Sequence, residues 1–471
     1  MGDNVKSIYF RNVALSLITS NPIAKYSLRL LTDKCKTCNL SVLEQILKNI
    51  LANEEMDKCD RCNRIYKYYR PGINLFIKHN SKFISDSFLS FSKLSDDYNI
   101  PSYARSMNSL LRGVLEYGIR KPLISSVPLS AVLEITKNCN LDCSYCYINK
   151  VGGHKELTTD QWVNIIDKLS DAGVASLSFS GGEPLLRKDF FTLLEYANAK
   201  EMSTSLATNG TMIDQKIAKK LYSTGLKYID ISIFSSNEEK NDFHRRKGSF
   251  KKAIDAVRYC KDSGLCVGLA ITMTSIVKDE VEDFLKLAKS INCDVCSFFN
   301  YIPMSNEEDK LSLSNNQKEK LISEMIIKRR EYDPYFKEIT ILQAPEVARL
   351  HYAMQTGESY ELKQIGFTKL NKSEHLLEYV GGCFAGRFII AITTSGDILP
   401  CPFFRVKLGN ILIDDILNVW RENQTLMSLR NRENLKGKCG SCKYKVLCGG
   451  CRARAFSQSG DVLESDFTCL A

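Results

Sequence analysis

Short β-branched and apolar runs alternate with amphipathic helical segments from about Ser126 to Pro303, and this alternation limits the possible folds more than any other feature of the chain. A strand followed by a helix and then by another strand builds a parallel sheet. Six such units predict an α/β fold with a partial (β/α)6 barrel, whose chemistry takes place at the carboxyl ends of the strands. The predicted strands are Ala131 to Thr136, Ala175 to Ser180, Thr204 to Ala207, Tyr228 to Ile233, Val267 to Met273 and Asp294 to Phe299.

Further modules are expected on both sides of this core, because 471 residues exceed the usual size of a single core. Residues 1–120 show helical periodicity and predict an α-rich module with two CxxC pairs. Residues 126–303 form the predicted barrel, and residues 304–380 a bridging region that becomes less regular after Asp333. Residues 381–471 hold seven cysteines, which predicts a module shaped by metal more than by an apolar core.

Eighteen cysteines occur mostly in pairs and triplets, a distribution typical of metal binding and not of a secreted disulfide framework. No secretory leader and no run of roughly 20 apolar residues is recognised, so a cytoplasmic protein with reduced thiols is expected. The net charge of +10 is spread along the chain, and no nucleic-acid partner is predicted.

Three of the cysteines, Cys139, Cys143 and Cys146, follow the first predicted strand at C-x3-C-x2-C spacing. Three thiolates can hold a four-iron cluster and leave one iron open to a cofactor or substrate. Zinc with a distant fourth ligand is the alternative. After a strand that opens a βα array, the spacing favours iron.

The segment around these cysteines resembles the radical S-adenosylmethionine (SAM) superfamily, and the resemblance covers roughly Ser126 to Pro303. It implies that the open iron of a 4Fe-4S cluster binds SAM, and that the reduced cluster splits SAM to give a 5′-deoxyadenosyl radical. Tyr145 matches an aromatic position near the adenine. The other implied cofactor-binding residues follow later strands: Gly181, Gly182 and Glu183 of the segment Ser180-Gly181-Gly182-Glu183-Pro184, then Thr208, Asn209 and Ser232. No catalytic side chain is assigned.

The two glycines let the backbone approach a ligand, and the Glu183 carboxylate can accept hydrogen bonds from the SAM ammonium group. The fourth strand departs from the family pattern. It ends Ile231-Ser232-Ile233-Phe234-Ser235-Ser236, where many relatives have aspartate followed by glycine. Ser232 and Ser235 are candidates for ribose or substrate contacts at this position.

The C-terminal cysteines resemble the SPASM extension, which carries auxiliary iron-sulfur clusters, although the gap between Cys448 and Cys451 is one residue shorter than in many relatives. The resemblance implies one fully ligated cluster and one held by three cysteines. The first set is Cys439, Cys442, Cys448 and Cys469, and the second is Cys383, Cys401 and Cys451. For the second cluster, another residue such as His375 and an open iron stay alternatives. Two zinc sites are the alternative without a redox role.

Two further pairs, Cys35 with Cys38 and Cys59 with Cys62, are 20 residues apart, a spacing typical of structural zinc. A third auxiliary iron-sulfur cluster is the alternative. The other cysteines lie in predicted core elements and are expected to be small buried hydrophobic residues: Cys260, Cys266, Cys293 and Cys296.

A radical SAM reaction with auxiliary clusters that accept an electron predicts an anaerobic oxidoreductase supplied by a flavodoxin or ferredoxin. A loose resemblance to archaeal lipid modifiers of the calditol synthase type favours a membrane tetraether lipid. Basic and apolar residues mixed over Ile8 to Leu31 and Phe76 to Phe91 predict peripheral contact with the inner face of the membrane. One alternative is a peptide maturase that forms thioether or carbon-carbon crosslinks. A second is a decarboxylase of tetrapyrrole haem precursors, because the stretch Cys439 to Phe456 resembles the same stretch of tetrapyrrole-modifying members of the superfamily. The third is a non-enzymatic electron-transfer protein.

Overall fold

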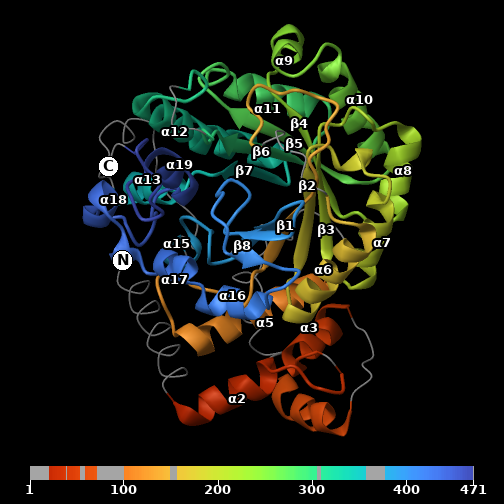
Figure 1. Cartoon of the computed structure of the whole chain (residues 1–471), viewed down its shortest axis with the longest axis vertical. Helices are drawn as coiled ribbons and strands as arrows, with labels where there is room; N and C mark the ends of the chain where they lie inside the picture. The colour runs from red at the N-terminus through yellow and green to blue at the C-terminus, as the bar shows by residue number, and fades with distance from the viewer. Residues whose placement is uncertain are drawn as a thin grey trace.

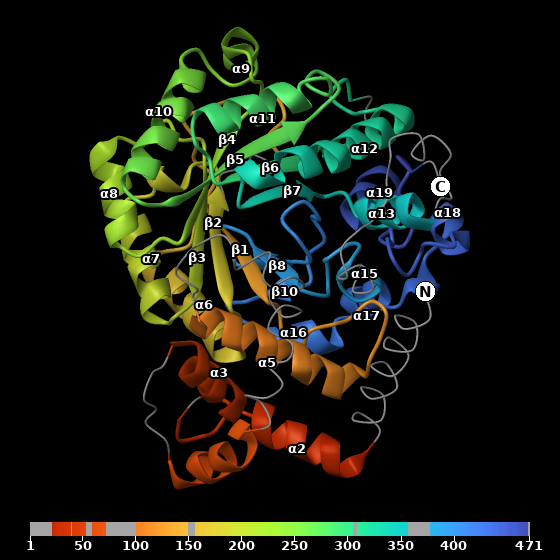
Figure 2. The same cartoon turned by 180° about the vertical axis from the view of Figure 1, so that it is seen from behind.

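The centre of the fold is one sheet of ten strands, in the order β10-β9-β8-β1-β2-β3-β4-β5-β6-β7 (Figures 1 and 2). The computed structural model describes residues 21–38, 40–52, 59–71, 100–148, 156–304, 309–356 and 377–469. All six predicted strands are present and parallel, and each end lies within one residue of its expected position. They are β1 (Ser130–Thr136), β2 (Ser176–Gly181), β3 (Ser203–Thr208), β4 (Tyr228–Ile233), β5 (Cys266–Met273) and β6 (Val295–Asn300).

Four further strands extend this sheet at both edges. In the bridging region, β7 (Glu338–Leu342) pairs in parallel with β6. From the C-terminal region, β8 (Ile389–Ile392) pairs in parallel with β1, and β9 (Asp397–Leu399) and β10 (Gly409–Asn410) follow antiparallel. The bridging and C-terminal regions therefore share a sheet with the barrel, and the described residues of the bridging region include β7 after Asp333.

Helices cover the outer face of the sheet. Thr158 caps α6 (Thr159–Ala172) in a capping box with Gln161, whose Ser/Thr-x-x-Glu/Gln spacing is visible in the sequence, and Gly173 ends that helix in the left-handed conformation, at φ 100°. The other helices of this layer are α7 (Phe190–Ala199), α8 (Gln215–Ser223), α9 (Glu238–His244), α10 (Ser249–Asp262), α11 (Val281–Ser290) and α12 (Asn315–Tyr332). In the bridging region lie α13 (Glu346–Thr356) and α15 (Leu377–Val380), and in the C-terminal region α16 (Ile416–Glu422), α17 (Gln424–Arg430), α18 (Gly437–Ser441) and α19 (Arg452–Ser459).

The two faces of the strands differ in chemistry. Alternate residues such as Phe179 and Ile231 are fully buried against the helices, in the main apolar core. The residues between them face the interior of the barrel and are polar and partly exposed. Ser178 aligns with Ser205, and Ser205 with Tyr228, so these three side chains share the inner face. The barrel interior is therefore a polar space.

The described residues of the N-terminal module are mostly helical, as predicted, and α2 and α3 lie at the end of the molecule opposite α9 in both views (Figures 1 and 2). Its described helices are α2 (Pro22–Thr32), α3 (Val42–Ala52), a helix over residues 60–71 and α5 (Ile100–Tyr117). Of the predicted membrane-contact segments, 8–20 and 76–91 lie outside the described residues. On α2, Ile23 and Tyr26 are exposed, whereas Leu31 is buried. No helix in the described ranges has the length and apolar character to cross a bilayer.

Candidate active site and auxiliary cysteine sites

The loop that carries Cys139, Cys143 and Cys146 leaves the carboxyl end of β1 and is bonded to the glycine segment after β2. The N–H of Gly182 donates to Thr136 O at 2.7 Å, and the N–H of Glu183 donates to Asn138 O at 2.7 Å. A Cβ at position 182 would lie 2.2 Å from Asn138 O, so only glycine permits this approach. The Gly-Gly-Glu segment thus fixes the start of the cysteine loop.

The other side of the cysteine loop is held by β3 and α9. Asn209 Nδ2 donates to Asn140 Oδ1 at 2.8 Å and lies 3.8 Å from Cys139 Sγ. The hydroxyl of Ser144 lies 3.0 Å from His244 Nδ1 at the end of α9. These contacts order the loop mainly through side chains other than the three cysteines, and the one N–H among them that faces a sulfur, at Cys139, is compatible with a thiolate that binds metal.

All three thiols are accessible: Cys139 and Cys143 are partly exposed and Cys146 is exposed. This donor set fits a site-differentiated cluster, because three thiolates leave one metal position free. Arg245 was not predicted. Its buried guanidinium donates to Ser232 O and lies beside Cys143. Burial alone would lower the pKa of Arg245, but Tyr145 and Cys143 raise it overall. Sequence spacing carries no signal for this long-range contact.

Glu183 is fully buried and has a structural role that its motif does not reveal. Its carboxylate accepts from Thr208 Oγ1 at 2.8 Å, from Asn209 N at 2.8 Å and from Leu185 N at 3.1 Å. Burial raises its pKa, although these three donors and Arg245 oppose the rise. Glu183 therefore orders Thr208 and Asn209, and its contact with the SAM ammonium group stays a prediction.

The remaining predicted SAM contacts lie around the same loop. Tyr145 stacks on Phe234, with ring centroids 4.9 Å apart, so one face of its ring is already covered. Ser232 is partly exposed on the inner face of β4. Ser235 is buried and donates to Glu280 at 2.7 Å, so its hydroxyl already has an internal partner. Of the two serines, Ser232 is the one positioned to meet a ligand.

A carboxyl group inside the barrel was also not predicted. Tyr228 Oη donates to Asp230 Oδ1 at 2.5 Å. Burial raises the pKa of Asp230 to about 6, although the hydroxyls of Tyr228 and Ser297 lower it. The polar interior therefore contains a group that titrates near neutral pH.

The mouth of the site is bounded by residues of the barrel and of the C-terminal region. Tyr147 bonds to Ser180 Oγ at 3.1 Å and packs on Phe403, with centroids 4.7 Å apart. Arg405 lies over the Tyr147 ring at 5.6 Å and binds Glu134 at 2.7 Å. We call Tyr147, Phe403 and Arg405 the mouth wall. All three are partly exposed.

The first C-terminal cysteine set lines one cavity, as its expected cluster requires: Cys439, Cys442, Cys448 and Cys469. Backbone N–H groups face its sulfurs. Gly450 N lies 3.4 Å from Cys448 Sγ, and Asp466 N lies 3.4 Å from Cys439 Sγ. Such N–H···S bonds stabilise cluster thiolates. The shortened Gly449-Gly450 gap is compatible with this geometry, because both glycines adopt positive φ.

The second set consists of Cys383, Cys401 and Cys451. Burial raises the pKa of the Cys401 thiol, and the charges of Cys383 and Cys451 add to the rise. Burial raises the pKa of Cys451 to about 11, with Arg454 opposing and Cys383 adding to the rise. His375, the candidate fourth ligand, lies outside the described residues. A set of three thiols fits a cluster that needs one further ligand or has an open iron.

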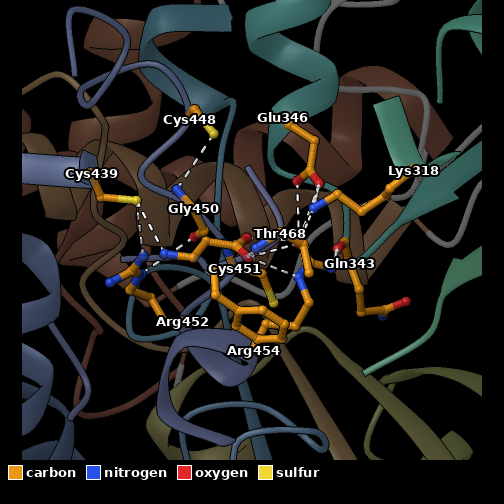
Figure 3. A network of polar contacts seen from close by, with 12 residues as sticks. Lys318, Gln343, Glu346, Cys439, Cys448, Gly450, Cys451, Arg452, Arg454 and Thr468 are labelled. Carbon is orange, nitrogen blue, oxygen red and sulfur yellow. Dashed lines mark hydrogen bonds and ion pairs between the residues drawn. The ribbon is translucent and has the colours of Figure 1, made fainter. Parts of the chain in front are cut away.

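A buried charge network joins the two cysteine sets (Figure 3). Arg454 is 1% exposed and binds Asp466 at 2.8 Å and Glu346 at 3.1 Å. Lys318 binds Glu346 at 2.5 Å. Asp466 in turn accepts from Cys451 N at 2.8 Å, and its carbonyl accepts from Cys469 N at 3.1 Å. The network therefore positions one ligand of each cysteine set.

Comparisons with known proteins agree with this arrangement. The Radical SAM superfamily model matches residues 133–310, and the SPASM iron-sulfur cluster-binding domain model matches residues 383–443. These domains imply SAM binding and 4Fe-4S clusters.

Several enzymes are similar over most of their length. An AdoMet-dependent heme synthase of Methanosarcina barkeri is 28% identical over 74% of this chain and 97% of its own. A mycofactocin maturase of Mycolicibacterium smegmatis is 28% identical over 70% of this chain and 79% of its own. Streptococcus suis SuiB bound to its precursor peptide SuiA has the same fold, at a TM-score of 0.60 and 20% identity over 89% of this chain and 95% of SuiB. With the cysteine loop at the end of a parallel sheet and cysteine sets in the C-terminal region, the chain belongs to the radical SAM superfamily, as an enzyme with a C-terminal SPASM domain.

Proposed function

We propose that this enzyme decarboxylates propionate side chains of a tetrapyrrole haem precursor. The mouth wall carries the proposal. Tyr147 and Phe403 pack on each other but are partly exposed, so their remaining ring surface can contact a flat macrocycle. Arg405, which lies over the Tyr147 ring, can offer a cation to a carboxylate. Glu134 accepts one N–H group of Arg405, and a guanidinium has five, so a propionate can share it. The heme synthase relative, whose matched region spans nearly its whole length, supports the same substrate class.

The chemistry is a net oxidation. A propionate that loses one hydrogen atom, one electron and carbon dioxide becomes a vinyl group. When bound, SAM with its cluster would supply the hydrogen-abstracting radical, and the auxiliary clusters an electron acceptor. Cys139, Cys143 and Cys146 would hold the first cluster. Gly181, Gly182, Glu183, Thr208, Asn209, Ser232 and Tyr145 would surround SAM, and the Glu183 carboxylate would also order Thr208 and Asn209. A flavodoxin or ferredoxin would deliver the first electron.

Two other substrates are weighed against this one. A peptide has the support of the mycofactocin maturase relative. A membrane lipid is the hypothesis that the sequence favours, but most of its amphipathic segments lie outside the described residues, and the relatives give it no support. Among the described residues of these segments, α2 exposes Ile23, Lys25 and Tyr26, which could contact a membrane.

The test is an anaerobic reaction of the reconstituted enzyme with Fe-coproporphyrin III, a ribosomal precursor peptide or archaeal tetraether lipid, followed by mass spectrometry. We expect the porphyrin to lose carbon dioxide plus two hydrogens for each propionate, while the peptide and lipid stay unchanged. A modified peptide or lipid with an unchanged porphyrin would refute the proposal.

Arg405→Met tests the mouth wall itself. Loss of a charged hydrogen bond of about 1.5–3 kcal/mol predicts roughly a tenfold to hundredfold fall in porphyrin turnover. Arg421→Met is the matched control, because Arg421 is similarly exposed and binds Glu116 at 3.2 Å in the α5 region. SAM cleavage without substrate is measured in both variants to exclude loss of the cluster. Equal porphyrin turnover in the two variants would contradict the role of Arg405.

A further inference from the structure

Four cysteines of the N-terminal module converge on one point, far from the radical SAM loop in sequence. The sulfurs of Cys35, Cys38, Cys59 and Cys62 all lie within 4.8 Å of one another. Two of the separations are 3.6 Å, between Cys35 and Cys59, and 3.9 Å, between Cys38 and Cys62. No disulfide joins them. Four sulfur atoms this close together form a site that can bind a metal ion.

The separations identify the kind of ligand. Four sulfurs placed tetrahedrally at about 2.3 Å from one zinc ion lie about 3.8 Å from one another. The two separations of 3.6 and 3.9 Å match this value. In a four-iron cluster each cysteine binds a different iron, so the sulfurs stand at the outer corners of a larger body and farther apart. The geometry therefore favours a single ion over the alternative of a third iron-sulfur cluster.

The position of the site favours a structural ion. The module contacts the barrel where β2 and β3 begin. Lys34 Nζ donates to Asp171 O at 2.8 Å, just before β2, and Lys48 binds Glu201 at 2.6 Å, just before β3. The Cys139 loop lies at the opposite, carboxyl end of these strands, and a six-residue strand spans roughly 20 Å. An ion at this place has no part in the chemistry of the barrel.

The module also needs an ion to fold. Its apolar core is small and separate from the main core, and the cysteines belong to it: Leu31, Cys35, Val42, Leu43, Ile46, Leu47, Cys62, Tyr66 and Ala104. Apolar cores of this size seldom hold a fold without a metal or disulfide. Cys35 and Cys38 lie in the loop between α2 and α3, and Cys59 and Cys62 at the start of the helix over 60–71. One ion would tie the loop that carries Lys34 to that helix.

We propose that Cys35, Cys38, Cys59 and Cys62 bind one structural zinc ion, which folds the N-terminal module and holds it on the barrel where β2 and β3 begin. The site is closed, with four thiolates and no open position, as in structural zinc sites. It does not depend on the substrate of the enzyme.

The full chain, purified anaerobically, is analysed for zinc and by X-ray absorption at the zinc edge. We expect one zinc per chain with four sulfur neighbours. Cys38→Ala should lose this zinc, whereas Cys38→His should keep it with three sulfurs and one nitrogen, since histidine is also a zinc ligand. Cys260→Ala is the control, because Cys260 is a buried thiol of α10 outside this group, and it should keep the zinc with four sulfurs.

Limited proteolysis of the same samples reports the fold of the module. Cys38→Ala should be cut within residues 21–71 at least tenfold faster than Cys260→Ala, while Cys38→His should resemble the control. Iron in place of zinc at these cysteines, zinc with oxygen ligands, or equal zinc content in Cys38→Ala and Cys260→Ala would each overturn the proposal.

Discussion

Replacing Arg454 by methionine should destabilise the C-terminal region strongly. Arg454 is 1% exposed, and its guanidinium binds two carboxylates, Asp466 and Glu346, which are also buried. The pKa of Asp466 is held far below its usual range: burial would raise it, but Arg454 and Lys318 lower it more. Without Arg454, two buried carboxylates share the single charge of Lys318. Removing one partner of a buried ion pair costs about 3–5 kcal/mol, and we expect a loss of this size.

The matched control is Lys436→Met. Lys436 binds Asp461 at 2.6 Å in the same region, but the two side chains are 53% and 35% exposed. An exposed pair contributes about 0–1 kcal/mol. The urea midpoints of the two variants and of the wild type, followed by circular dichroism, give the difference in the free energy of unfolding.

Iron content is a second measurement on the same variants. Because Asp466 positions Cys451 and Cys469, Arg454→Met should lose auxiliary iron and keep the iron of the SAM cluster. Lys436→Met should keep both. If Arg454→Met unfolded at the same urea concentration as Lys436→Met and retained its auxiliary iron, the reasoning about the network would be refuted.

Two further results follow from the site. Gly182→Ala should lose the iron of the SAM cluster, because its Cβ would lie 2.2 Å from Asn138 O. Gly460→Ala strains the left-handed backbone after α19, at φ 71°, but its Cβ meets open space, so this variant should keep that iron. Equal iron content in the two variants would contradict the role of Gly182. Asp230 has a pKa of about 6 in the folded protein and about 3.9 in the unfolded chain. Between these two pH values the folded state binds more protons than the unfolded state, so the free energy of unfolding should fall as the pH rises from about 4 to about 6. Asp230→Asn, which can still accept from Tyr228, should abolish this fall in urea titrations across that range, and an unchanged pH dependence would argue against the raised pKa.

The strands could be predicted from sequence because their pattern is local. Tyr228 to Ile233 alternates inner-face and fully buried residues, and the prediction agrees with β4 at both ends. The capping box of Thr158 is equally local, since both of its hydrogen bonds join residues three positions apart. The edge strands were missed because they are short: β7 has five residues and β9 three, too few for a periodic pattern to stand out.

The cysteine ligands could also be predicted from short sequence spacings, but the residues that hold these ligands in place could not. Arg454 meets Glu346 across 108 residues, and Arg405 meets Glu134 across 271. No spacing rule connects such pairs. The Glu183 carboxylate likewise bonds to Thr208 and Asn209 on another strand, so its motif alone does not reveal that it orders them. Sequence reasoning therefore finds ligands more readily than the groups that hold them.

SAM cleavage by the reconstituted enzyme under anaerobic reduction is the most direct measurement of the radical SAM activity. The wild type should convert SAM to methionine and 5′-deoxyadenosine. Cys143→Ala should not, because two remaining thiolates do not hold a site-differentiated cluster. Cys296→Ala, which removes a buried thiol of β6, should cleave SAM like the wild type. Cleavage at the wild-type rate by Cys143→Ala would contradict the assignment of this loop as the cluster site.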